Sequence, residues 1–128
     1  MTTLMDLAAA PLALSLSAVD QAPAVRAAVR AYAAKVVADI ELLDDIELMA
    51  SEAITNALLH GSVPVHVTVT TIPGMLRVEV DDQGPPPGSN TSRDDNNGRG
   101  LFIIDALAEA WRLTRERQGT RLVFEVLI

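Results

Sequence analysis

Three polar residues, Glu52, Asn56 and His60, stand four positions apart in a stretch that is otherwise largely apolar. The apolar residues around them recur at intervals of three and four: Ile46, Met49, Ala50, Ala53, Ile54 and Ala57. This period predicts a helix over residues 47–61 that ends at Gly61. At about 100° per residue, the three polar side chains follow one edge of the buried stripe and point into a half-buried groove.

A carboxylate, an amide and an imidazole in such a groove need partners, because a buried polar group without a hydrogen bond costs about 1 to 3 kcal/mol. A polar ligand or a hydrated metal ion would supply those partners. The carbonyl oxygen of Asn56 suits Mg²⁺, which prefers oxygen ligands and shares its shell with water and phosphates. Glu52, one turn earlier, can take the proton of a hydroxyl or water that attacks a terminal phosphate. The alternative is structural: Asn56 and His60 cap or brace the neighbouring backbone.

Two shorter clusters add to this pattern. Asp82 ends an expected strand, where its carboxylate can accept a hydrogen bond from an adenine amino group, and Gly84 lets the backbone approach closely. The segment 98–101, Gly-Arg-Gly-Leu, opens an expected helix, so its backbone N–H groups can hold phosphate at the positive end of the helix dipole. Taken alone, the first cluster also fits an acidic turn and the second a helix that merely begins after glycines.

Residues 83–98, between these clusters, are turn formers and small polar residues without an apolar period. Loops of this length inside a compact domain are uncommon, and they are usually functional lids or disordered segments. We therefore expect a lid over residues 83–98.

The remaining periods predict the elements that must position these residues. Alternating patterns indicate strands at 12–16, 65–70, 76–80, 111–117 and 120–128, and helical patterns indicate helices at 21–37 and 101–108 in addition to 47–61. The expected fold class is α+β: a two-layer sandwich with a mixed, mostly antiparallel sheet covered on one face by three helices. In the last strand we expect Leu122, Phe124, Val126 and Ile128 to face the core. His66 should point outward, and Trp111 should be a core residue or an edge anchor.

Composition narrows the function classes. The 128 residues are 49% hydrophobic, which predicts one domain over residues 1–128. A net charge of −7 argues against a nucleic-acid-binding surface, although four arginines gather in the last quarter: Arg112, Arg115, Arg117 and Arg121. The absence of cysteine excludes disulfides and thiol chemistry and favours the cytoplasm. The apolar run 7–19 has no preceding Lys or Arg and is too short to span a bilayer, so we expect neither a signal peptide nor a membrane anchor.

The chain resembles the GHKL superfamily of ATP-binding domains, and within it the anti-sigma factor serine/threonine kinases. Four motifs occur in family order: Glu52-Ala53-Ile54-Thr55-Asn56-Ala57-Leu58-Leu59-His60 is similar to the N box, Asp82-Gln83-Gly84 to the G1 box, Gly98-Arg99-Gly100-Leu101 to the G2 box, and Gly119-Thr120 to the closing Gly-Thr motif. By position, the resemblance implies that Asn56 coordinates Mg²⁺, Glu52 is the general base, Asp82 binds adenine with support from Thr120, Gly98, Arg99 and Gly100 hold the phosphates, and His60 lies near the triphosphate. Arg93 in the lid, or Arg99, would offset phosphate charge.

The resemblance implies an anti-sigma factor that binds ATP and Mg²⁺, sequesters a sigma factor, and phosphorylates a serine or threonine of an anti-anti-sigma protein; a homodimer is plausible. One departure keeps a non-catalytic binding module of the same fold open as the alternative. The fuller G1 pattern has a second glycine two residues after Gly84, where this chain has Pro86. Because proline fixes φ and lacks an N–H, it should stiffen the start of the lid.

Overall fold

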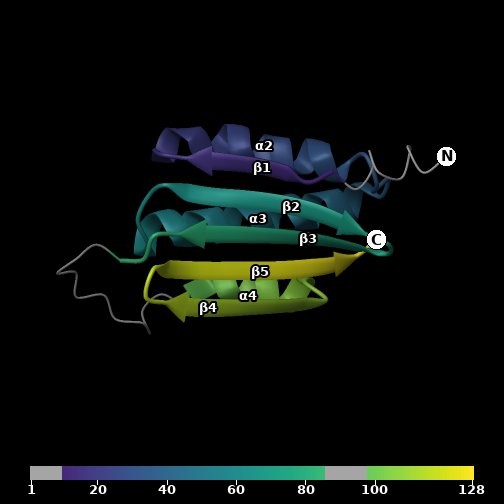
Figure 1. The fold of residues 1–128 in the computed structure, drawn as a ribbon. Coiled ribbons are helices and arrows are strands. Elements are labelled where there is room, and N and C mark those ends of the chain that lie inside the picture. The colour runs from purple at the N-terminus through teal and green to yellow at the C-terminus, as the bar shows by residue number, and fades with distance from the viewer. Residues whose placement is uncertain (1–9, 86–97) are drawn as a thin grey trace.

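The computed structural model describes residues 10–85 and 98–128 (Figure 1). Its elements follow in the order β1 (Leu12–Leu16), the 3-10 helix η1 (Val19–Gln21), α2 (Ala22–Ala33), α3 (Ile40–His60), β2 (Val65–Ile72), β3 (Met75–Asp82), α4 (Gly98–Leu107), β4 (Ala110–Glu116) and β5 (Gly119–Leu127). All the predicted strands and helices are present, and their order is confirmed.

The five strands form one sheet in the order β1-β2-β3-β5-β4, and helices α2, α3 and α4 cover one of its faces (Figure 1). The predicted α+β two-layer architecture is therefore confirmed. The sheet was expected to be mixed, but every pairing among the described strands is antiparallel. Connectivity explains this. Two helices between β1 and β2 return the chain to the end where β1 finished, and β5 inserts between β3 and β4, which run in the same direction.

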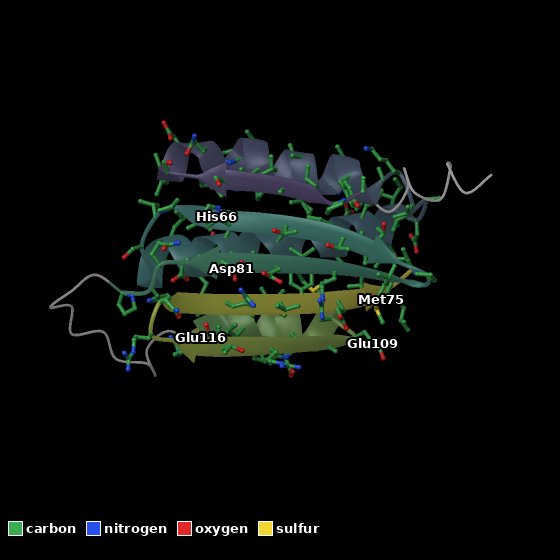
Figure 2. All side chains as sticks on the ribbon, viewed as in Figure 1. His66, Met75, Asp81, Glu109 and Glu116 are labelled. Carbon is green, nitrogen blue, oxygen red and sulfur yellow. The ribbon has the colours of Figure 1, made fainter. Side chains whose placement is uncertain are left out.

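The core lies between the sheet and the helices. The predicted stripe of α3 is fully buried, with no member more than 3% exposed: Ile46, Met49, Ala50, Ala53, Ile54 and Ala57. Strands β2 and β3 contribute alternate valines, and β5 contributes Phe124, which has no exposed surface. The opposite face of the sheet carries polar side chains, and Figure 2 looks onto it, with His66 and Asp81 labelled. His66 is exposed there, as predicted.

Two helix ends and one core position differ from those predicted by more than a short shift of an element's bounds. Helix α2 ends at Ala33 rather than at residue 37, because the chain turns there and leaves Val36 39% exposed. Helix α3 begins at Ile40, seven residues earlier than expected, because the Asp39 side chain accepts a hydrogen bond from the Glu41 N–H at 3.0 Å and caps it. Ile128 is 40% exposed rather than in the core, since it lies beyond the end of β5.

Candidate functional site

The chemistry-bearing residues of α3 lie on the half of the helix that leads to its C-terminus. Glu52, Asn56 and His60 are all half-buried, and His60 is the last helical residue, as the predicted polar edge requires. The first turn of α4 packs beside them. A Cβ placed on Gly100 would lie 3.2 Å from Oε1 of Glu52, so the two helices meet at this carboxylate. The first turn of α4 thus lies against the polar edge of α3.

Asp82, the last residue of β3, has a buried carboxyl group, because the residue is only 8% exposed. Its Oδ1 accepts a hydrogen bond from the Gly84 N–H at 2.7 Å, and the carboxylate also accepts one from the Thr120 N–H across the β3–β5 ladder. Burial raises the pKa of Asp82 above its ordinary value, and the two backbone N–H groups and the positive charge of Arg115 oppose that rise. Gly84 adopts a φ of 86°, which favours glycine and lets the backbone turn back on this carboxylate.

Gly61, directly after α3, is packed against Asp82. A Cβ on Gly61 would overlap the Asp82 carboxyl group, with Oδ2 only 2.6 Å away. Only a residue without a side chain leaves room for the acid at this position. From the sequence, Gly61 was predicted as the end of the helix and not as a site residue.

Ser62 ties the same loop to the exit of β3. Its Oγ donates a hydrogen bond to the Gly84 carbonyl at 2.6 Å, and its carbonyl accepts one from the Gln83 N–H at 3.0 Å. The Gln83 side chain in turn donates to the Pro64 carbonyl at 3.1 Å. Ser62 was not predicted as a site residue either. A small polar residue directly after a helix-ending glycine was the available signal, and it is a weak one.

The structure brings most of the predicted site residues to one end of the sheet (Figure 1). This end contains the C-terminal half of α3, the end of β3, the start of α4 and the β4–β5 turn. Gly98, Arg99, Gly100 and Leu101 form the first turn of α4 as expected, although the side chain of Arg99 is outside the described atoms. The predicted lid falls largely on residues 86–97, and it and Arg93 lie outside the described residues.

Hollows lie on the described part of the sheet both at the site end and away from it. One, of about 270 Å³, is lined by residues at the sheet end that include Asp81, Asp82 and Thr120. The other, of about 390 Å³, lies on the open face of the sheet beside Trp111 and Arg112 and contains none of the motif residues. Trp111 was predicted to be a core residue or an edge anchor, and the structure confirms the edge anchor. The side chain is half-buried on the edge strand β4, and its Nε1 donates a hydrogen bond to Asp105 at 2.8 Å.

The hydrogen-bonding and oxygen groups at this end of the sheet suit a nucleotide that binds together with a loosely held hard cation. Asp82 is a buried acceptor, the α4 N-terminus presents backbone N–H groups, and Asn56 presents an amide oxygen. Among residues 10–85 and 98–128, no three His, Cys, Asp or Glu side chains are grouped so that they could hold a metal ion. A Mg²⁺ ion would therefore depend on Asn56, on water and on ligand phosphates, which is the usual way in which proteins bind Mg²⁺ with nucleotides. In the same described ranges, no helix has the length and apolar character needed to cross a membrane.

Comparison with known proteins gives one family. The family model described as the histidine kinase-like ATPase domain matches residues 16–126. No curated protein matches the chain.

The solved structures that match the chain include two with TM-scores above 0.5. A chain in the SiaB–SiaC complex from Pseudomonas aeruginosa superposes with a TM-score of 0.59 at 15% identity, covering 91% of this chain and 88% of that one. The histidine kinase AdeS of Acinetobacter baumannii gives a TM-score of 0.51 at 17% identity, covering 66% of this chain. The histidine kinase domain of the blue-light activated kinase from Erythrobacter litoralis gives 0.49 at 27% identity, covering 68% of this chain. This chain spans 46% and 48% of the two histidine kinase chains, about half their length.

Proposed function

Because the chain belongs to the histidine kinase-like ATPase domain family, we propose that it binds ATP with Mg²⁺ and acts as an anti-sigma factor with protein serine/threonine kinase activity. One observation carries the nucleotide part. Four sequence motifs that are far apart in the chain meet at one end of the sheet, around a buried carboxylate with two backbone N–H donors.

Each residue has a distinct task in this proposal. Asp82 accepts a hydrogen bond from the adenine amino group, and Thr120 and Gly84 hold the carboxylate in place through their N–H groups. The first turn of α4, Gly98 to Leu101, binds the phosphates with its backbone N–H groups, and Arg99 and Arg93 offset their charge. His60 lies beside the triphosphate. Asn56 contributes an oxygen to Mg²⁺, which neutralises charge on the phosphates.

Glu52 is the general base of the proposed transfer. It lies one turn before Asn56 on the same edge of α3 and beside Gly100, where its carboxylate can take the proton from an acceptor hydroxyl. The acceptor is a serine or threonine of an anti-anti-sigma protein, and the sigma factor is held until that protein is engaged. These partners rest on the resemblance of the four motifs to anti-sigma kinases, and a cytoplasmic location follows from them.

A non-catalytic binding module is the second candidate. The observation in its favour is Pro86, two residues after Gly84, where the related motif has a glycine. A proline there removes an N–H and fixes φ, so the segment after β3 has fewer ways to rearrange around phosphates. In this version the chain captures its protein partner stoichiometrically and transfers no phosphate.

A homodimer forms part of the proposal, and the edge of the sheet supports it. Strand β1 is an outer strand, and none of its residues from Leu12 to Leu16 is charged. The opposite edge strand, β4, carries Arg112, Arg115 and Glu116, and charges of this kind discourage pairing with a second chain. Pairing of two β1 strands would cover an edge that has no partner strand among the described residues. Sedimentation velocity of Ala13→Lys against the parent chain tests this, and an unchanged oligomeric state would exclude β1.

Phosphoryl transfer separates the two candidate functions. The purified chain is incubated with γ-labelled ATP, Mg²⁺ and a candidate anti-anti-sigma protein. A kinase labels a serine or threonine of the partner, and Glu52→Gln abolishes the label while ATP binding, measured by calorimetry, remains. Asn56→Ala should weaken binding of ATP with Mg²⁺. Tight partner binding without label transfer would support the non-catalytic module, and an absence of ATP binding by the parent chain would refute the nucleotide site.

A further inference from the structure

Arg115 lies in the same row of the sheet as the buried acid of the site. In the β3–β5 ladder Asp82 is paired with Thr120, and in the β4–β5 ladder Thr120 is paired with Arg115. Paired residues in an antiparallel sheet point to the same face. The three side chains therefore point to the same face of the sheet at the site end, where Asp82 is buried and Arg115 is exposed. Two strand spacings, about 10 Å, separate Arg115 from Asp82.

Among the described residues, Arg115 is the cation near Asp82 whose charge is not taken up by a neighbouring carboxylate. The next positive charge, Arg121, belongs to the open face of the sheet and is held by Asp81 at 2.8 Å and Glu79 at 3.4 Å. Within the described residues Arg115 makes no salt bridge, so its charge is not already neutralised.

The other groups around Asp82 come from its own strand, from α3 and from β5, and they do not all stabilise its ionised form. On its own strand, Asp81 adds a like charge that favours the protonated form of Asp82. From α3, the titratable side chains at this end are His60 and Glu52, and the residue that touches Asp82 is the uncharged Gly61. From β5 the contact is the Thr120 N–H. Arg115 is thus the cation from the packed elements that favours the charged form.

We infer that Arg115 is a positioning residue of the nucleotide site, which keeps Asp82 ionised and thereby sets a preference for purines that carry an amino group over purines that carry an oxo group. This inference rests on the proposed nucleotide-binding function. An ionised carboxylate can accept a hydrogen bond from the amino group of adenine and repels the oxo group of hypoxanthine. A protonated Asp82 donates instead, so the discrimination between the two bases is lost. Burial pushes Asp82 toward the protonated form, and Arg115 counteracts it.

The strand supplies a matched control for this residue. Arg112 lies three positions earlier on β4, and an odd spacing places it on the open face, paired with Val123. Arg112→Gln therefore removes the same charge from the same strand without changing the row of Asp82. Arg115→Lys keeps the charge and should behave as the parent chain does.

The experiment measures binding of ATP and of inosine triphosphate (ITP) over a range of pH at low ionic strength, for the parent chain and the three variants. Both nucleotides carry the same triphosphate, so the ratio of their affinities isolates the base. In the parent chain the ATP preference should fall as pH falls and Asp82 becomes protonated. In Arg115→Gln the fall should begin at higher pH, with about threefold less ATP preference near the midpoint, and the difference should shrink in high salt. Arg112→Gln and Arg115→Lys should follow the parent chain.

A second measurement keeps this inference separate from the proposed function. The side-chain carboxyl carbon of Asp82 is titrated by NMR in the nucleotide-free chain. An upward move of its midpoint in Arg115→Gln, absent from Arg112→Gln, supports the role of Arg115 whether or not ATP binds. Identical midpoints in the parent chain and Arg115→Gln overturn it. Failure of the parent chain to bind ATP would overturn the nucleotide site and the base preference with it.

Discussion

Replacing Gly61 with alanine should displace the Asp82 carboxylate and remove the preference for adenine. The added methyl would overlap the carboxyl group and lie 2.6 Å from Oδ2, well inside an ordinary contact. The carboxylate is not free to swing away, because Gly84 and Thr120 hold it with N–H donors and it is only 8% exposed. The variant must therefore give up at least one hydrogen bond to a charged acceptor.

The size of the effect follows from that hydrogen bond. Hydrogen bonds to charged groups contribute about 1.5 to 3 kcal/mol. Loss of the adenine contact alone should weaken ATP binding by about 10- to 150-fold, since each 1.4 kcal/mol is a factor of ten. ITP does not use the carboxylate as an acceptor for an amino group, so its affinity should change much less. The ratio of ATP to ITP affinity should consequently approach one.

Calorimetric titration of both nucleotides measures this ratio, and urea unfolding measures how much stability is lost. Gly74→Ala is the matched control: it makes the same substitution at the β2–β3 turn, where nothing lies within 4 Å of an added Cβ. Its φ of 80° strains alanine, so it should lower the free energy of unfolding by about 1 kcal/mol without changing the nucleotide ratio. A folded Gly61→Ala variant that keeps the ATP-to-ITP affinity ratio of the parent chain would refute the role of Asp82 in binding adenine.

Three further perturbations have defined outcomes. Asp82→Asn should favour ITP over ATP in the same titrations. The pKa of Asp82 is raised in the folded state, so the contribution of Asp82 to stability falls as pH rises from the ordinary carboxyl range to the raised pKa. The free energy of unfolding of the parent chain minus that of Asp82→Asn should therefore decrease over this pH window. Above the window the difference should be constant. Ser62→Ala removes the 2.6 Å bond to the Gly84 carbonyl and should cost about 1 kcal/mol in urea unfolding, with weaker ATP binding; unchanged stability and affinity would mean that this bond does not hold the site. Phe124→Ala, at a fully buried position, should lower the free energy of unfolding by about 3 to 5 kcal/mol in the same assay, and a loss below about 1 kcal/mol would contradict the burial of Phe124 in the core.

Local patterns were enough to predict most of the fold. The buried stripe of α3 and the alternation in β2 and β3 have periods of 3.6 and 2, and each can be read within a dozen residues. Errors in the bounds of elements fell at their ends, where a cap or a turn decides, and the other error was the expectation of a mixed sheet. The Asp39 cap placed the start of α3 earlier than the stripe indicated, and Ile128 continued the alternation of β5 beyond the point where the sheet covers it.

The candidate site was predictable only in part. Asp82, Asn56 and Glu52 were recognisable because their types and spacing are unusual in an apolar setting. Gly61 and Ser62 were not, because their roles depend on residues more than twenty positions away. A glycine after a helix has many ordinary explanations, and only its contact with the Asp82 carboxyl group identifies the one that applies here.

The sequence by itself determined which segments form strands and helices, which residues carry the chemistry, and the family to which they point, because these depend on side-chain type and on short-range periodicity. The tertiary structure decided which of those residues meet. Insertion of β5 between β3 and β4 aligned Asp82, Thr120 and Arg115 in one row, and the docking of α3 against the end of β3 placed Gly61 on the acid. Strand order and helix packing are set by the burial of the whole core, and no local pattern contains that information.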